Sequence, residues 1–315
     1  MSNIEMREVF CSKLEEWMAK DERIVVIDSD LARANGTLRL REKFPGRALD
    51  VGVAESNMAS MAAGLSSYGF IPFIGSFAPF SSRRICDQLA ISICYAKQNV
   101  KIIGSDPGVT AEFNGGTHMS FEDIGVLRSL PGIVIFEPAD EVQLRQGIDA
   151  AIDHDGPVYI RLFRKPAEEI YSADYKFDLF KADVLREGNS VAIFSSGIMC
   201  GTALTAAKML ADDGISAEVV NVHTIKPLDE ETVLRSASKC GCAVTAENHS
   251  IIGGLRSAVA EVLSGRNPMP LKAVGVQDHF GEVAKAPYLL KKYGMTAEDI
   301  AAAAKESINM KEGLK

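Results

Sequence analysis

The sequence lacks the features that mark secreted and membrane proteins. No apolar run approaches the roughly 18 residues of a membrane-spanning helix, and the opening MSNIEMREVF has no basic segment followed by an apolar leader. The six cysteines form no paired CxxC motifs, which argues against a disulfide framework or a cysteine-rich zinc site. We therefore expect a cytoplasmic protein whose cysteines are ordinary thiols.

Positive charge is also scarce. The 315 residues include 34 Lys and Arg against 42 Asp and Glu, a formal net charge of −8, and there is no basic stripe with interleaved aromatics. This balance argues against a nucleic-acid-binding protein. With 47% hydrophobic residues the chain can bury a sizeable core, and its length favours two domains.

The common catalytic fingerprints are missing as well. The sequence has no GxGxxG after its first predicted strand, no GxxxxGK[ST], no GxSxG and no HExxH. Their absence argues against a dinucleotide-binding turn, a P-loop, a hydrolase nucleophile elbow and a zinc-protease helix. The five histidines are too dispersed to suggest a metal cluster, so no metal ligand is predicted from this chain.

What the first half of the chain does contain is an alternation of short β-branched runs and helical patterns. A helix is predicted over 5–20, and further helical patterns cover 55–67, 82–97 and 141–152. Strands buried on both faces and separated by helices imply a mostly parallel sheet in an α/β fold. The strand-like runs are IVVID (24–28), FIPFIG (70–75), VKIIG (100–104), IVIFE (133–137) and VYIRL (158–162).

A charged stretch, KFDLFKADVLREG (176–188), interrupts this alternation and is expected to connect two domains. The first domain is then 1–175 and the second 189–315, each with a mostly parallel sheet flanked by helices. Helical patterns in the second domain cover 202–212 and 255–263. Its strand-like runs are SVAIF (190–194), AEVVN (217–221), AVTAE (243–247) and LKAVGV (271–276).

Two segments of the first domain point to chemistry. In DVGVAESNMASMAAGL (50–65) Glu55 stands at the entrance of a helix made of small and apolar residues. A carboxylate there is satisfied either by the helix N-terminus or by a functional partner. The loop GSDPGVTAEFNGGTH (104–118) follows a predicted strand and ends in His118, at the sheet edge where ligands gather in open parallel sheets.

Five segments together resemble the C-terminal half of transketolase, a thiamine-diphosphate enzyme. They cover essentially the whole chain in the family's order. The resemblance implies a thiamine-diphosphate pyrimidine-binding fold followed by a transketolase C-terminal domain. The segments are DVGVAESNMASMAAGL (50–65), GSFAPFSSRRICDQL (75–89), NGGTHMSFEDIGVLRSLPGIVIFEPADEVQ (114–143), AENHSIIGGLRSAVAEVL (246–263) and VGVQDHFGE (274–282).

The resemblance implies a cofactor role for Glu55. In the family the matching glutamate binds N1′ of the aminopyrimidine and favours the imino form that deprotonates the thiazolium ring. Phe77 and Phe80 match aromatic residues that line the aminopyrimidine pocket, where a flat ring gains from stacking. Arg83, where transketolases usually carry tyrosine, and Asp28, at the end of the first strand, complete the expected cofactor contacts.

Substrate contacts are implied in the same way. His118 matches a histidine that contacts donor oxygens near the reacting carbon, where an imidazole stabilises an oxyanion or moves a proton. Asn114 stands in place of an aspartate that reads a hydroxyl, and Ser105-Asp106 in place of a His-Asp pair. Arg164 and Arg7 match phosphate-binding arginines, a task suited to a planar guanidinium. Arg161 either assists them or forms a structural ion pair.

The family's GDG…N segment, which binds Mg²⁺ and the diphosphate, is absent from this sequence. The resemblance therefore implies a two-subunit transketolase in which an N-terminal subunit supplies these groups, as a dimer of heterodimers acting on sugar phosphates. Three other readings stay open: a 2-oxoacid dehydrogenase E1 β-type subunit, a 1-deoxyxylulose-5-phosphate synthase-like subunit, and a non-catalytic scaffold. The donor and acceptor sugars are not specified by the sequence.

Overall fold

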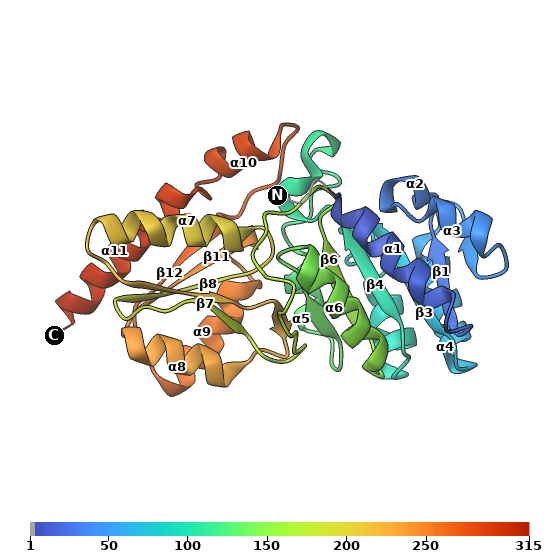
Figure 1. Cartoon of the computed structure of the whole chain (residues 1–315), viewed down its shortest axis with the longest axis horizontal. Coiled ribbons are helices and arrows are strands. Elements are labelled where there is room, and N and C mark those ends of the chain that lie inside the picture. The colour runs from blue at the N-terminus through green and yellow to red at the C-terminus, as the bar shows by residue number, and fades with distance from the viewer. Residues whose placement is uncertain (1–3, 315) are drawn as a thin grey trace.

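Two sheets organise the chain in the computed structural model, which describes residues 4–314 (Figure 1). The first half of the chain builds a seven-stranded sheet that also takes in one strand from the second half. Its elements are α1 (Met6–Met18), β1 (Ile24–Asp28), α2 (Ala32–Asn35), α3 (Leu38–Lys43), β2 (Ala48–Asp50), α4 (Glu55–Ser67), β3 (Ile71–Phe77), the π-helical η1 (Gln88–Tyr95), β4 (Lys101–Ser105), the 3₁₀-helical η2 (Gly108–Asn114), α5 (Asp123–Arg128), β5 (Val134–Phe136), α6 (Glu141–Asp153) and β6 (Val158–Leu162).

The second half builds a five-stranded sheet. Its helices α7 and α11 lie on one side of the sheet, and α8 and α9 lie on the other (Figure 1). The elements are β7 (Asp183–Arg186), β8 (Val191–Ser195), α7 (Met199–Asp212), β9 (Ala217–Asn221), β10 (Thr224–Lys226), α8 (Glu230–Cys240), β11 (Ala243–Ser250), α9 (Leu255–Arg266), β12 (Leu271–Val276), α10 (Ala286–Lys292) and α11 (Ala297–Gly313).

Both sheets are mostly parallel, as the sequence predicted. The strand orders are β10-β5-β6-β4-β3-β1-β2 and β12-β11-β8-β9-β7, with antiparallel pairing only for β10 against β5 and β7 against β9. The central strands β1, β3, β4 and β6 are buried along their whole length, because helices cover both faces of the sheet. Their carboxyl ends therefore form one edge of the first domain.

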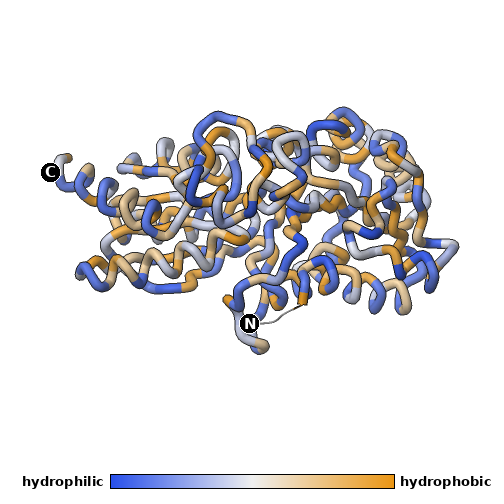
Figure 2. The backbone as a smooth tube through the Cα atoms, turned by 90° about the horizontal axis from the view of Figure 1, so that it is seen from above, coloured by the Kyte–Doolittle hydropathy of each residue, from blue (hydrophilic) through white to orange (hydrophobic). Residues whose placement is uncertain are grey.

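The two domains are interlocked. Strand β10, from the second half of the chain, pairs with β5 at the edge of the first sheet. One hydrophobic cluster also runs continuously from α4, η1 and α5 beneath the first sheet to α8 and α9 beneath the second. Along the helices, apolar and polar residues alternate in the hydropathy trace, as expected for helices packed on one side (Figure 2).

The predicted element bounds agree well with the structure where the pattern was strongest. The strands 158–162, 217–221 and 271–276 and the helix 55–67 have the predicted limits. The expected connection 176–188 contains β7, which pairs with β9 in the second sheet. No helix among residues 4–314 is both long and apolar enough to cross a membrane.

Candidate active site

Glu55 is the first residue of α4 and is only 4% exposed. Both of its carboxylate oxygens lie 3.4 Å from Nη1 of Arg84, whose side chain is about half exposed. The rest of the buried face of α4 is apolar, formed by Met58, Ala59 and Ala62. A nearly buried carboxylate thus has one long contact with a mobile type of side chain, in a setting where charge needs a partner.

Phe77 ends β3, and Phe80 follows in the turn after it. The rings of both lie edge-on to the imidazole of His118, at centroid distances of 5.4 and 5.1 Å. Thr117 Oγ1 lies 2.9 Å from His118 Nδ1. The structure thereby brings the predicted histidine of the loop onto the predicted aromatic pair at the end of β3.

Arg164 lies just beyond the end of β6, with its guanidinium 5.4 Å from the Phe77 ring centroid. Its side chain forms an ion pair with Asp106, and its backbone N–H donates to Asp106 Oδ1 at 3.1 Å. The backbone N–H of Arg7 donates to the carbonyl of Arg164, so the two predicted anion-binding arginines are neighbours. Both keep part of the side chain exposed, 26% for Arg164 and 29% for Arg7.

Burial raises the pKa of Asp106 to about 6, although Arg164 and Arg7 act to lower it. The carboxyl is only 1% exposed and sits in the left-handed region at φ 51°. Asp106 therefore orients Arg164 through its ion pair and backbone hydrogen bond. Direct contact of Asp106 with the substrate stays a prediction.

Arg84 is the site residue that sequence reasoning missed. Its Cζ lies 4.4 Å from the centroid of Phe80, and it reaches Glu55 from there. A four-residue spacing from Phe80 could have indicated this contact, because such spacing places side chains together on a helical turn. With Arg84 included, the side chains form a continuous chain of contacts that we call the site row: Glu55, Arg84, Phe80, His118, Phe77, Arg164 and Asp106.

Two other predicted site residues lie beneath the site row and support it. Asp28 is 2% exposed and accepts hydrogen bonds from Asn35 Nδ2 at 3.0 Å and Thr37 Oγ1 at 2.7 Å. Ser105 is equally buried, and its hydroxyl donates to Asn35 Oδ1 at 3.0 Å. These bonds tie the ends of β1 and β4 together, so Asp28 and Ser105 have structural partners within the chain. Their predicted ligand contacts stay predictions.

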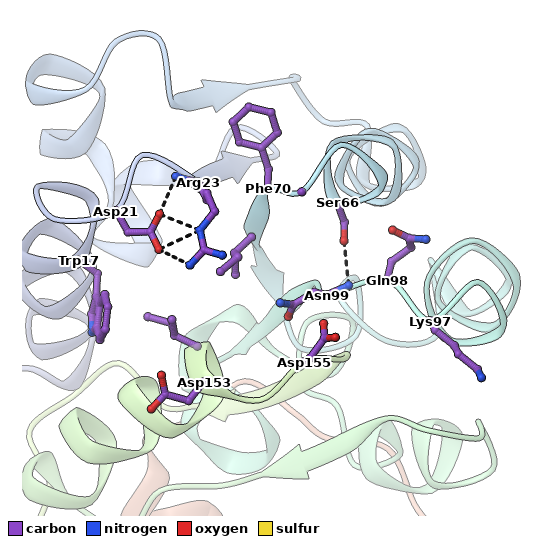
Figure 3. A pocket seen from close by; sticks show the side chains of 13 residues that line it. Trp17, Asp21, Arg23, Ser66, Phe70, Lys97, Gln98, Asn99, Asp153 and Asp155 are labelled. Atoms are coloured by element: carbon purple, nitrogen blue, oxygen red, sulfur yellow. Dashed lines mark hydrogen bonds and ion pairs between the residues drawn. The ribbon is translucent and has the colours of Figure 1, made fainter.

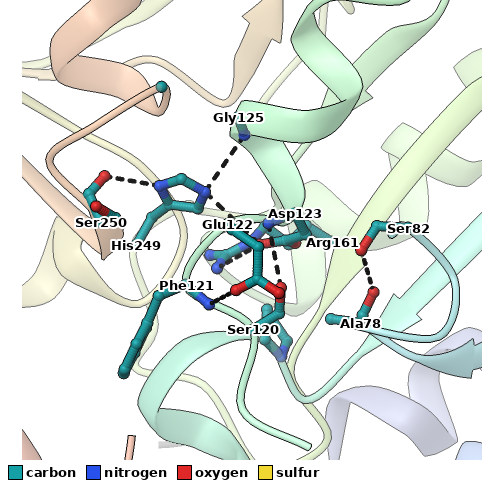
Figure 4. A network of polar contacts seen from close by, with 12 residues as sticks. Ala78, Ser82, Ser120, Phe121, Glu122, Asp123, Gly125, Arg161, His249 and Ser250 are labelled. Atoms are coloured by element: carbon teal, nitrogen blue, oxygen red, sulfur yellow. Dashed lines mark hydrogen bonds and ion pairs between the residues drawn. The ribbon is translucent and has the colours of Figure 1, made fainter. Parts of the chain in front are cut away.

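Arg161 is also structural. It is fully buried between the domains, where Asp123 accepts from Nε at 2.8 Å (Figure 4). Glu137 accepts from Nη1 at 2.5 Å. Its Nη2 donates to the carbonyl of Asn248 in the second domain, at 2.7 Å. Of the two readings of Arg161, the structural ion pair is correct, because the guanidinium is enclosed by protein.

Arg83 and Asn114 take less central positions. Arg83 pairs with Glu122 at the rim of a cavity of about 340 Å³ between the domains, which also touches Met119, Phe121 and Phe280. It is Arg84, not Arg83, that contacts Glu55. Asn114 is exposed at the end of η2, four residues before His118 in the same loop.

A second cavity, at the other end of the first sheet's strands, is less suited to catalysis. A cavity of about 520 Å³ lies at the opposite edge of the first sheet, lined by residues that precede β1, β3 and β4 (Figure 3). Its Asp21 and Arg23 already pair at 2.7 Å, and Ser66 accepts from the Asn99 backbone at 2.8 Å. Within residues 4–314 no group of three or more His, Cys, Asp and Glu side chains is placed to hold a metal ion.

Comparison with known proteins gives a consistent picture. Residues 2–168 match the family described as transketolase, pyrimidine binding domain, and residues 180–300 match transketolase, C-terminal domain. The chain is 54% identical over 301 residues to the 6-deoxy-6-sulfo-D-fructose transketolase subunit SqwH of Clostridium sp. (strain MSTE9), covering 96% of this chain and 94% of that protein.

Two further similarities are as extensive. Identity is 39% over 300 residues with a putative transketolase C-terminal section of Methanocaldococcus jannaschii, covering 94% of each chain. A solved structure described as a split gene transketolase, inactive beta4 tetramer, superposes with a TM-score of 0.90 at 43% identity. That match covers 98% of this chain and 99% of the other.

Proposed function

This chain belongs to the transketolase family, with a pyrimidine-binding domain and a C-terminal domain, and on that basis we propose that it is the C-terminal subunit of a two-subunit transketolase. Together with an N-terminal subunit it would transfer a two-carbon ketol unit from a ketose to an aldose. The observation that carries the proposal is the site row. The site row contains a buried carboxylate, an aromatic surface, an imidazole and a partly exposed arginine in one line of contacts.

The residues present fit the aminopyrimidine half of thiamine diphosphate. Glu55 is nearly buried, yet its carboxylate contacts the half-exposed guanidinium of Arg84 only at the long distance of 3.4 Å. A ring nitrogen able to share a proton with this carboxylate would satisfy it better in an apolar setting. Phe80 and Phe77 offer ring surface beside it for a flat heterocycle.

When bound, thiamine diphosphate supplies the carbon centre that stabilises the negative charge of the ketol unit. The chain's own residues then have distinct tasks. Glu55 holds a proton at the aminopyrimidine nitrogen, and the Phe80 and Phe77 rings keep water from that contact. His118, whose Nδ1 is beside Thr117, presents Nε2 to a donor oxygen, where it holds or moves a proton.

The opposite end of the site row suits the charged end of the donor. Arg164 is oriented by Asp106, and its backbone is hydrogen-bonded to that of Arg7, whose guanidinium pairs with Glu5; both arginine side chains remain partly exposed. A guanidinium is well suited to recognising a tetrahedral oxyanion. We propose a ketose with a terminal phosphate or sulfonate, and the sulfosugar named for the Clostridium relative makes the sulfonate the first donor to test.

The remaining half of the cofactor would be held by the partner subunit. We assign the Mg²⁺ ligands and the diphosphate contacts to an N-terminal chain carrying the GDG…N segment that is missing here. A dimer of heterodimers is the assembly we expect. All six cysteines of this chain are free thiols, which supports the reducing, cytoplasmic setting that we propose for it.

The decisive experiment is reconstitution with that partner. The wild-type complex should transfer a ketol unit from 6-deoxy-6-sulfofructose or a ketose phosphate to an aldose phosphate, and only with thiamine diphosphate and Mg²⁺. Glu55→Gln should lower kcat at least about 100-fold, since it removes the proton-sharing carboxylate. Glu306→Gln, at an exposed position of α11, is the matched control and should have unchanged kcat. Normal turnover by Glu55→Gln would contradict the assignment.

The same complex separates the other readings. Pyruvate decarboxylation without ketol transfer would favour a 2-oxoacid dehydrogenase subunit, and condensation of pyruvate with a triose phosphate would favour a deoxyxylulose-phosphate synthase-like subunit. Absence of any thiamine-dependent signal in cofactor titration would favour a scaffold. Each of these results would overturn the transketolase proposal.

A further inference from the structure

The loop from Pro107 to His118 is held at its start by a side chain of the second domain. Asn248, at 1% exposure in β11, accepts from the Val109 backbone N–H at 2.9 Å and donates to the Pro107 carbonyl at 3.0 Å. Gly108, at φ +58°, passes so close that a Cβ would stand 2.2 Å from Asn248 Oδ1. One buried amide therefore fixes the backbone path on both sides of Gly108.

A second attachment lies in the middle of the loop, at Glu112. Glu112 has φ 46° and ψ −115°, a left-handed backbone that is strained for a side-chain-bearing residue. Its carboxylate accepts from the backbone N–H of Ala286, the first residue of α10, at 2.9 Å, and forms an ion pair with Lys165. These contacts outweigh the opposing effect of burial and hold the pKa of Glu112 below its usual value.

The loop backbone also touches the second domain directly. A Cβ on Gly116 would stand 2.4 Å from the carbonyl oxygen of Gly281, and one on Gly115 would stand 2.7 Å from Val283. No side chain fits between the loop and the segment before α10 at these positions. The second domain therefore acts as a close-fitting surface for the loop.

Two backbone hydrogen bonds connect Glu112 to the predicted catalytic histidine, His118. The Glu112 carbonyl accepts from the Gly115 N–H at 3.1 Å, and the Gly115 carbonyl accepts from the His118 N–H at 3.0 Å. Asn114 lies within the first of these two turns. A change in the position of Glu112 must move both Asn114 and His118, since the backbone bonds connect them in series.

We propose that the C-terminal domain sets donor recognition by holding this loop, with Glu112 and Asn248 as positioning residues. The proposal rests on the proposed function, because it concerns how that same site reads its donor. Neither residue touches the reacting atoms. Their contribution is to fix Asn114 and His118 relative to the aromatic rings at the end of β3.

The test uses the reconstituted complex with three variants. Glu112→Gly relieves the backbone strain and removes the tether, whereas Glu112→Gln keeps an acceptor for the Ala286 N–H. Arg128→Met is the matched control, because it breaks interdomain contacts to Gly253 and Glu261 that do not involve the loop. For each complex we would measure donor KM and kcat, discrimination between donors epimeric at one hydroxyl, and amide hydrogen exchange at Val109.

We expect Glu112→Gly to raise the donor KM about tenfold, to lower the epimer discrimination severalfold, and to leave kcat within about threefold. Glu112→Gln should recover most of the KM, and Arg128→Met should stay within about twofold of wild type. Faster exchange in Glu112→Gly with unchanged KM and discrimination would overturn the proposal, as would an equal loss in Arg128→Met. An inactive wild-type complex would instead overturn the proposed function, and the exchange measurement does not depend on turnover.

Discussion

Two arginines three residues apart, Arg161 and Arg164, both form ion pairs with carboxylates, but the two ion pairs lie in different surroundings. Arg161 lies within β6 with its guanidinium fully buried against Asp123 and Glu137, whereas Arg164 lies just past the strand with about a quarter of its side chain exposed beside Asp106. The first pair is enclosed by both domains, and the second borders the site row. Completeness of burial, not the presence of the ion pair, separates the structural Arg161 from Arg164, which we propose binds an anion.

The carboxyl groups that pair with these two arginines, Asp123 and Asp106, differ in the direction of their pKa shifts. Burial works to raise the pKa of Asp123, but Arg161 and His249 hold it below its usual value. Burial prevails at Asp106, where the pKa is raised to about 6 despite Arg164. Asp123 therefore stays ionised through the whole physiological range, while Asp106 changes charge near the acidic end of it.

The largest effect is expected on stability, from removing the buried guanidinium of Arg161. Arg161→Met would leave Asp123 and Glu137 buried without their cation, so we expect the free energy of unfolding to fall by about 3–5 kcal/mol. Urea unfolding followed by circular dichroism measures this. Arg164→Met is the matched variant and should change the stability by less than about 1 kcal/mol. Equal stability of the two variants would show that burial does not make the Arg161 ion pairs more important for stability than the Arg164 ion pair.

Substitution of the partly exposed Arg164 should instead affect donor binding. Arg164→Met removes a charged donor from the anion site, and hydrogen bonds to charged groups contribute roughly 1.5–3 kcal/mol, so the KM for an anionic donor should rise about 10- to 100-fold. Steady-state kinetics with a sulfonated and an uncharged ketose provide the measurement and its control. A similar rise with the uncharged ketose would mean that Arg164 does not bind the anion.

A smaller change is expected at the other end of the site row. The Arg84 guanidinium contacts Glu55 and Phe80, the two groups we assign to the aminopyrimidine, so the ring must displace it or share them. Arg84→Met should therefore tighten thiamine diphosphate binding by the complex about two- to fivefold, measured by calorimetry. Arg83→Met, which breaks the contact with Glu122, should leave the affinity unchanged. Weaker binding by Arg84→Met would show that Arg84 assists the cofactor.

The smallest predicted effect is a pH dependence at Asp106. Below about pH 6 its carboxyl becomes neutral and no longer offsets the charge of Arg164, so the KM for a sulfonated donor should fall about two- to threefold between pH 7.5 and 5. A sulfonate keeps its charge there, whereas a phosphate titrates near pH 6. Asp106→Asn should abolish the dependence, and an unchanged slope in that variant would assign it to another group.

The raised pKa of Asp106 also determines whether its contribution to stability rises or falls with pH. The folded-state pKa of Asp106, about 6, exceeds its ordinary value of 3.8, so the folded chain binds more protons than the unfolded chain between these values. The contribution of Asp106 to stability is therefore largest at the acidic end of this window and declines as the pH rises through it.

Much of the fold could be predicted because its strands are buried on both faces. Runs such as VYIRL and AEVVN are apolar enough to be recognised without their neighbours, and their limits agree with β6 and β9. Strand β10 could not be recognised, since it is three residues long and pairs with a strand of the other domain. The predicted helix 82–97 contains a turn before η1, which starts only at Gln88.

The candidate site divides in the same way. Glu55, Phe77, Phe80, His118 and Arg164 could be named because motifs of the family carry them, and the structure places them in contact. The burial of Arg161 also follows from its position inside a strand covered on both faces, but its partners come from three separate segments that no local pattern connects. Arg84 was missed because the family motif draws attention to position 83.

The insertion of β10 into the first sheet has a consequence for how the chain is made. During synthesis the first sheet keeps an open edge at β5 until residue 226 has left the ribosome, long after the rest of that sheet is available. Such an edge is a template for unwanted pairing with other chains. A polypeptide stopped near residue 175 would carry it permanently, so the two halves are expected to mature as a single cooperative unit.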